Sequence, residues 1–195
     1  MGKLNLIGLL LCSIAITISS IPFAHANIAQ GPKAVEQWFQ KLSHAKPKIT
    51  KLHFYFHDIV SGKNPTAIPI AQANSTSHSP TSFGLLAVLD DRLTIGPQIN
   101  STTIGRAQGI VGAASIDEFS LLMSLNFVFT NGKYNGSTLS LLGRNTVLNE
   151  YREMPIVGGS GVFRLARGVA TAKTYFLSNS SGDAIVEYNV VVLHY

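Results

Sequence analysis

Apolar and polar residues alternate along most of the chain from Leu52 onward, which is the pattern of β-strands that bury one face. Turn residues separate the alternating runs, and the segment 131–136, with Asn131-Gly132 and Asn135-Gly136, joins two of them as a hairpin. Residues 72–81 form a polar loop. The candidate strands are 51–60, 82–90, 104–115, 119–130, 136–142, 161–177 (an interrupted run) and 184–194.

Seven or eight strands without an interior helix predict an antiparallel β-barrel or a sandwich. Glycines inside the run 104–115, such as Gly105, Gly109 and Gly112, favour a barrel, where a closed sheet coils sharply or strands approach closely. The runs 121–129 and 185–193 are apolar on both faces. Their outer faces need cover as well, so we expect a homo-oligomer.

The first residues have the features of a secretory signal peptide: Lys3, an apolar stretch over 4–21, and the cleavage motif Ala24-His25-Ala26. A membrane anchor is the alternative, but polar residues interrupt the stretch and the cleavage motif follows it. We expect residues 1–26 to be removed and the protein to be secreted, with no membrane segment afterwards. Residues 27–50 are then an N-terminal arm, either a short amphipathic helix around Trp38 or a loosely held segment. Residues 51–195 form a single domain.

The amino-acid composition excludes several kinds of site and partner. The only cysteine, Cys12, lies in the signal peptide, so the mature chain can form neither a disulfide nor a thiolate metal site. The formal net charge of +5 is spread along the sequence, and this predicts no nucleic-acid partner. It suits an acidic extracellular matrix or serves solubility alone. Four N-x-S/T sequons predict glycosylation at Asn74, Asn100, Asn135 and Asn179.

No standard catalytic motif is present, and no cofactor or metal is predicted. The string Gly158-Gly159-Ser160-Gly161 is interpreted as a turn, because no lysine and helix follow it as in a phosphate-binding loop. His53 and His57 are four residues apart on a strand, or roughly 13 Å, which is too far for two ligands of one metal.

The candidate site begins with the aromatic run His53-Phe54-Tyr55-Phe56-His57-Asp58. If this strand alternates, Leu52, Phe54, Phe56 and Asp58 share one face, and that face is an apolar wall ending in a carboxylate. Such an acid is costly unless it is paired, hydrated or functional. Five arginines also lie in or next to the apolar strands. A salt bridge to an acidic residue would explain any one of them, but the acids and arginines together suggest a pocket for a flat phenolic guest. These arginines are Arg106, Arg144, Arg152, Arg164 and Arg167.

Four blocks of this sequence, in order, resemble the plant dirigent proteins. They are His53 to Ile59, Gly105-Arg106-Ala107-Gln108-Gly109, Arg152 to Gly161, and Ala166-Arg167-Gly168. The resemblance covers about residues 51–195. It implies an all-β, eight-stranded antiparallel barrel that forms a dimer or trimer in the apoplast.

Residue roles follow from the same resemblance. Asp58 matches a strand-one aspartate proposed to bind or protonate a quinone methide, and Arg152 matches a pocket arginine. Asn145 stands where lignan-forming members have a second aspartate, and Val111 and Ala113 stand where they have two tyrosines. With Phe56, these residues are the expected substrate-binding set, and Asp58 is expected to be the main proton-handling group. The missing disulfide places the chain in the disulfide-free branch, near pterocarpan-forming members.

The resemblance leaves three functions open. The first is a non-oxidative auxiliary protein that directs the stereochemistry of phenoxy-radical coupling or quinone-methide reactions in lignan, flavonolignan or lignin metabolism. It would work beside a separate oxidase such as a laccase or peroxidase that acts on monolignols. The second is an enzyme that dehydrates isoflavanols with Asp58 as general acid or base. The third is a structural or defence protein of the cell wall.

Overall fold

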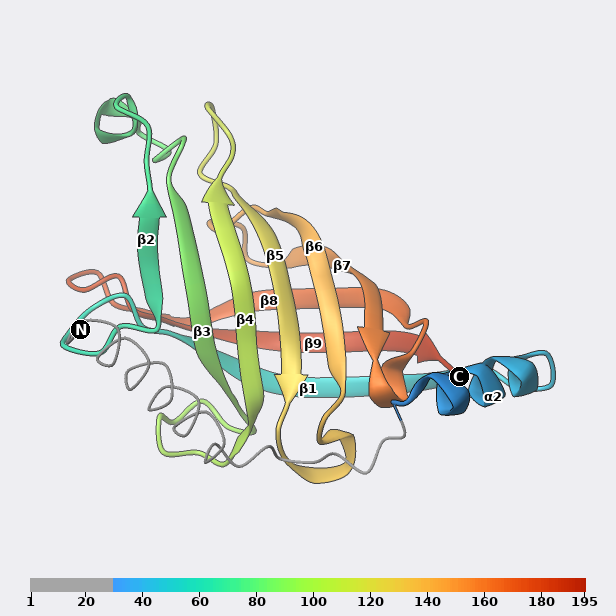
Figure 1. The fold of residues 1–195 in the computed structure, drawn as a ribbon. Coiled ribbons are helices and arrows are strands. Elements are labelled where there is room, and N and C mark those ends of the chain that lie inside the picture. Colours follow the sequence, from blue (N-terminus) through green and yellow to red (C-terminus); the bar gives the residue numbers. More distant parts are fainter. Residues whose placement is uncertain (1–29) are drawn as a thin grey trace, which may run out of the picture.

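A computed structural model describes residues 30–195 and shows a β-barrel preceded by one helix (Figure 1). The predicted signal peptide lies outside the described residues. No helix within residues 30–195 is long and apolar enough to cross a membrane. The elements are α2 (Pro32–Leu42), β1 (Lys48–Asp58), β2 (Ala67–Ala71), β3 (Leu86–Thr94), β4 (Thr103–Ala113), β5 (Leu121–Phe129), β6 (Thr138–Asn145), β7 (Arg152–Ser160), β8 (Arg167–Leu177) and β9 (Ala184–His194), with short 3₁₀ turns η1 (Thr76–His78), η2 (Gly132–Tyr134) and η3 (Gly161–Phe163).

The nine strands make eight positions around the barrel, because β1 and β2 together occupy one of them. All pairings are antiparallel and follow the order β1-β9-β8-β7-β6-β5-β4-β3-β2. The second half of β1 pairs with the end of β3, with His57 opposite Arg92, and β2 continues along the same edge, with Ala67 opposite Leu89. Ile59 and Thr66 close the loop between the two halves through a backbone hydrogen bond of 2.7 Å. The expected eight-stranded antiparallel barrel is confirmed.

Glycines allow neighbouring strands to approach closely, as the sequence predicts, but not at every position. A Cβ at Gly105 would lie 2.2 Å from the carbonyl oxygen of Val128 across the sheet, and one at Gly168 would lie 2.1 Å from that of Val191. At Gly112 the nearest atom would be 3.5 Å away, so an alanine fits there. Glycine is therefore needed at Gly105 and Gly168, and likewise at Gly109, where a Cβ would lie 2.1 Å from the carbonyl oxygen of Ser124; any side chain at these positions would push two strands apart.

Two strands differ from the sequence-based expectation, and both contain a proline. The run 161–177 proves to be β8 alone, and β7 precedes it, with Gly158 to Ser160 inside the strand rather than in a turn. The pairing of β6 with β7 skips Val157 as a bulge and ends at Ile156, so Pro155 has no partner on that side. The end of this pairing accommodates the proline, which cannot donate a hydrogen bond. In the same way Pro69 lies in the short strand β2, which no sequence pattern indicated.

The barrel is filled with aromatic side chains at one end. Phe54, Phe127 and Tyr188 pack with ring centroids 5.1–5.7 Å apart in the middle of the barrel. Phe129 and Phe163 follow towards the end where β9 finishes, 5.7 Å apart. Such edge-on and stacked contacts add to the stabilisation from apolar burial. A cavity lies at the other end of the barrel.

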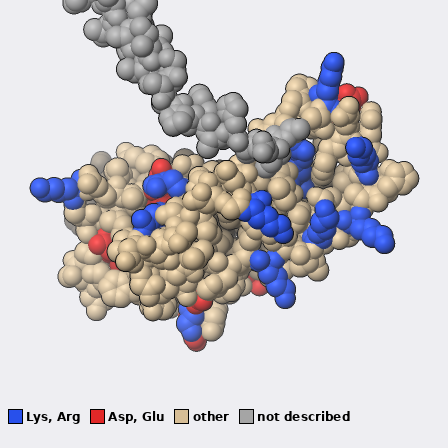
Figure 2. Space-filling model, turned by 90° about the horizontal axis from the view of Figure 1, so that it is seen from below, with Lys and Arg blue, Asp and Glu red and all other residues tan. Residues whose placement is uncertain are grey.

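The N-terminal arm forms the amphipathic helix α2, one of the two structures that the sequence allows. Pro32 begins it, as proline does at first helical positions, and none of its residues is buried. Trp38 packs edge-on against Phe39 and lies 5.5 Å from the guanidinium of Arg164. Basic side chains are most numerous on the side of the molecule that carries α2 (Figure 2).

Three of the four sequon asparagines are exposed in loops, and this gives a prediction for glycosylation. Asn74, Asn100 and Asn179 are exposed, whereas Asn135 is partly buried directly after η2. We expect the protein, when expressed through a eukaryotic secretory pathway, to lose mass on treatment with an N-glycosidase. Each Asn→Gln change at an exposed site should remove one glycan, and Asn135→Gln should remove the least. A secreted protein of unmodified mass would contradict the prediction.

An apolar area on the outer face of β2–β6 gives the oligomer prediction a location. The register places Ile68, Val88 and Ile110 side by side across β2, β3 and β4, and Leu122 and Leu142 follow on β5 and β6. All of these except Val88 are largely exposed in the single chain. Contiguous exposed apolar areas mark interfaces. We expect Leu122→Lys to dissociate a dimer or trimer in light scattering, and Ile49→Lys, at a still more exposed residue of β1, to leave it assembled. A wild-type monomer at high concentration would refute this.

Candidate functional site

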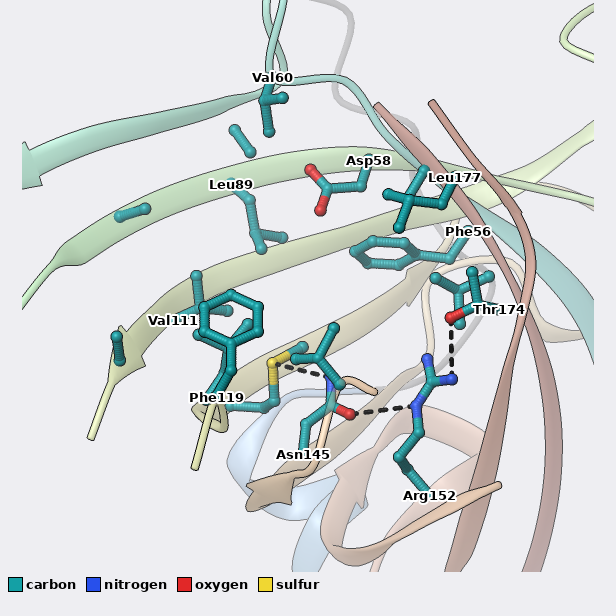
Figure 3. Close-up of a pocket in the computed structure, with 18 of the residues that line it drawn as sticks. Phe56, Asp58, Val60, Leu89, Val111, Phe119, Asn145, Arg152, Thr174 and Leu177 are labelled. Carbon is teal, nitrogen blue, oxygen red and sulfur yellow. Dashed lines mark hydrogen bonds between the residues drawn. The ribbon is translucent and has the colours of Figure 1, made fainter. Parts of the chain in front are cut away.

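A cavity of about 330 Å³ occupies the end of the barrel where β1, β4 and β8 finish (Figure 3). Apolar side chains make most of its wall, with Phe56 at the floor and Val111 and Phe119 on one side. Val60 and Leu177 lie at its rim. A volume of this size suits a small aromatic molecule rather than a polymer.

Asp58 lies on the cavity wall, as the alternation of β1 predicts. Phe54 and Phe56 point inwards on the same face and are buried, while His53 faces outwards to Glu187 at 2.6 Å. Asp58 is largely buried, and its Oδ1 is shielded from solvent and has no hydrogen-bond partner. Burial, with the nearby charge of Asp183, raises the pKa of Asp58 to about 6. The side chain can therefore hold and release a proton close to neutral pH.

Arg152 enters the cavity from β7, on the side away from Asp58 (Figure 3). Its Nε donates to the amide oxygen of Asn145 at 3.2 Å, and Nη1 donates to the hydroxyl of Thr174 at 2.9 Å and to the carbonyl of Asn149 at 3.3 Å. The residue is buried, and burial lowers its pKa. Within residues 30–195 no ion pair includes it. A buried guanidinium held only by neutral acceptors is suited to bind an anionic oxygen.

The remaining expected binding residues also lie in this cavity. Val111 and Ala113, from β4, form an apolar wall. Asn145 is buried at the end of β6, where it orients Arg152 and places its amide nitrogen 3.8 Å from the sulfur of Met123. The structure thus brings together Phe56, Asp58, Val111, Ala113, Asn145 and Arg152, which are separated by up to 96 positions in the sequence.

Comparison with known proteins decides the family. The family model described as "Dirigent-like protein" matches residues 49–193, which is nearly all of the described chain. The chain belongs to the dirigent family. Members of this family are typically secreted plant proteins that act on phenolic small molecules.

This dirigent protein is similar to several proteins of known name and to solved structures. It is 54% identical to Dirigent protein 21 of Arabidopsis thaliana over 77% of this chain and 80% of that protein. It is 46% identical to Pterocarpan synthase 1 of Glycyrrhiza echinata over 79% of this chain and 82% of that protein. Among solved structures, a pterocarpan synthase dirigent protein superposes with a TM-score of 0.72 at 46% identity, covering 77% of this chain and 87% of the other.

The other arginines singled out from the sequence lie away from the cavity. Arg106 pairs with Asp90 on the barrel surface, and Arg144 pairs with Glu118. Both arginines therefore have the structural role expected of a single arginine, a salt bridge between surface side chains. His57 is buried on the outer face of β1, where its Nε2 lies 2.7 Å from the hydroxyl of Thr94. Within residues 30–195 no group of His, Cys, Asp and Glu is arranged to hold a metal ion.

Two ionisable groups near Asp58 were not anticipated. Tyr188, on β9, lines the cavity and is almost fully buried, and burial raises its pKa. Asp91, on β3, is fully buried next to Asp58, and burial raises its pKa to about 7. Asp58 is therefore accompanied by a phenol and a second carboxyl group. Strict alternation along β9 and β3 could have identified both, because the residues two positions away from each on its strand are buried on the same inner face.

Proposed function

We propose that this dirigent protein binds a flat phenolic substrate and controls the stereochemistry of its reaction through a quinone methide, without oxidising it. The observation that carries the proposal is the placing of Arg152 and Asp58 on different sides of one apolar cavity (Figure 3). The guanidinium suits the phenolic oxygen, which carries negative charge as the quinone methide forms and reacts. Asp58 is suited to donate the proton that the departing hydroxyl oxygen needs.

The chemistry balances without an oxidant. In a phenol with a hydroxyl-bearing carbon attached to its ring, the carbon–oxygen bond breaks and the hydroxyl takes a proton from Asp58 and departs as water. The phenol releases its own proton to solvent, which leaves a neutral quinone methide with its oxygen near Arg152, and a proton from solvent restores Asp58. A second hydroxyl then attacks the methide carbon, and its proton passes to the quinone-methide oxygen. The net change is loss of one water.

The apolar wall would determine the product's configuration. A planar quinone methide held against Phe56 exposes only one of its two faces to the attacking hydroxyl, because the protein covers the other. The likeness to pterocarpan synthases supports an isoflavanol as the substrate, with ring closure as the second step.

The test is turnover of an isoflavanol by the purified protein alone, followed by chiral chromatography. We expect a cyclised product with one enantiomer in large excess, at a rate proportional to protein concentration. Absence of turnover without an oxidase would refute the dehydrating activity.

A second candidate is the direction of phenoxy-radical coupling, and the 54% identity to a protein named as a dirigent favours it. Here a laccase or peroxidase would form radicals from a monolignol, and the cavity would present one face of the radical or of the quinone methide formed after coupling. Coniferyl alcohol and laccase, with and without the protein, test this candidate. A racemic product at saturating protein would exclude it.

A further inference from the structure

The fully buried Asp91 has no role in the chemistry described above, and its position is set by strand register. On β1 and β3, His57 lies opposite Arg92 and Phe56 lies opposite Leu93. One further step of this antiparallel register places Asp58 opposite Asp91, with both side chains on the inner face. Directly opposed residues have Cβ atoms about 5 Å apart. The two carboxyl groups are therefore neighbours inside the barrel.

The surroundings of the two carboxyl groups provide little to balance two negative charges. Oδ1 of Asp58 and Oδ2 of Asp91 are both shielded from solvent and have no hydrogen-bond partner. The other oxygen of Asp91 accepts a hydrogen bond from the hydroxyl of Thr66, which closes the loop between β1 and β2. Arg106 acts on Asp91 only weakly, since it pairs with Asp90 on the outside of the barrel.

The charged and titratable groups around the pair come from four other places. Asp183, in the hairpin before β9, raises the pKa of Asp58, and Asp90 raises that of Asp91. Tyr188, from β9, is a buried phenol, and Arg152 lies across the cavity. Burial opposes ionisation of the two carboxyl groups most, and the charges of Asp183 and Asp90 add to it, while the hydrogen bond from Thr66 and the charge of Arg106 act the other way on Asp91. Two like charges at this separation in a buried site cannot both form readily.

We propose that Asp58 and Asp91 share one proton at neutral pH, and that Asp91 is a positioning residue that keeps this proton available to the substrate through Asp58. The role in catalysis rests on the proposed function, whereas proton sharing does not. The two residues are not equivalent, because only Asp58 lines the cavity, while Asp91 lies behind it and is held by Thr66. The proton thus enters and leaves through Asp58, and Asp91 sets how firmly it is held.

Carboxyl NMR of the mature protein tests proton sharing without any substrate. The chain has five aspartates, so the ¹³C carboxyl signals can be assigned by substitution. We expect the signals of Asp58 and Asp91 to titrate together, well above the range of exposed aspartates. In Asp91→Asn the midpoint of Asp58 should fall by about one pH unit, and in Asp58→Asn that of Asp91 should fall likewise. Asp117→Asn, in the exposed loop between β4 and β5, should leave the Asp58 midpoint unchanged.

Independent titration overturns the proposal: if the Asp58 midpoint is the same in wild type and Asp91→Asn, the proton is not shared. Should Asp91→Asn fail to fold, Thr66→Val serves instead: loss of the donated hydrogen bond should raise the midpoint of Asp91 and, through the shared proton, change that of Asp58. An Asp58 midpoint that stays the same while that of Asp91 rises counts against the pair. For a substrate that the protein turns over, Asp91→Asn should also move the pH profile to lower pH by a similar amount. A shared proton in an inactive protein would instead refute only the proposed function.

Discussion

Replacing Asp58 by asparagine is expected to lower turnover of a quinone-methide-forming phenol at least about 100-fold, the usual range for loss of a positioned general acid. Asparagine has nearly the same shape, so the cavity and the apolar wall around Phe56 should remain. Binding of the substrate should change much less than the rate of the chemical step. Rapid-mixing measurement of one turnover, with binding measured separately, distinguishes the two effects.

The pH dependence follows from the same residue. Asp58 acts as an acid only in its protonated form, so turnover should fall as the pH rises through about 6, the pKa of the buried carboxyl. Folding raises this pKa from 3.8, so the native state binds more protons than the unfolded chain between these values. The free energy of unfolding should therefore fall as the pH rises across this range, and Asp58→Asn should reduce that slope.

A matched substitution at Asp90 distinguishes loss of the proton donor from the mere loss of one carboxylate charge. Asp90→Asn removes an exposed carboxylate of the same strand region that pairs with Arg106, and it should keep turnover within about twofold, because surface ion pairs contribute little. Full activity in Asp58→Asn would show that another group supplies the proton. In that case Tyr188, the other proton donor on the cavity wall, would be the next residue to substitute.

The alternation of apolar and polar residues is sufficient to predict which side chains of β1 face the cavity. In β1 it identified the inward face with Phe54, Phe56 and Asp58, because a strand that lines a barrel cannot exchange its faces without losing its buried side chains. The resemblance to dirigent proteins added Arg152, Asn145, Val111 and Ala113, which no local pattern connects to β1. All of them line one cavity.

What the sequence did not reveal depends on contacts between distant segments. The sequence did not predict β2 and β7, because Pro69 and Pro155 argue against strands. In the folded sheet Pro69 lies in a short strand, and Pro155 lies where the pairing with β6 has ended, so both are tolerated. The pairing of Asp58 with Asp91 depends on closure of the barrel between β1 and β3. Register across a closed sheet is a tertiary property, and neither strand alone predicts it.

Replacing Arg152 by methionine is expected to weaken binding of a phenolate ligand at least tenfold and to lower turnover about 100-fold, since charge-assisted hydrogen bonds are worth about 1.5–3 kcal/mol. The fold should tolerate the change. Arg152 is a buried cation with no carboxylate partner, so its removal relieves a desolvation cost while the amide oxygen of Asn145 loses its donor. These effects oppose each other, and the free energy of unfolding should change by less than about 2 kcal/mol.

Arg152→Lys is the control that separates charge from geometry. Lysine keeps the positive charge but cannot donate to Asn145 and Thr174 while presenting a further nitrogen to the ligand, so we expect intermediate binding and lower enantiomeric excess. Titration calorimetry with a phenolic ligand, thermal unfolding and chiral chromatography provide the three measurements. If Arg152→Met binds and turns over substrate as the wild type does, the guanidinium has only the structural role of joining β6, β7 and β8, and the phenolic oxygen must be held elsewhere in the cavity.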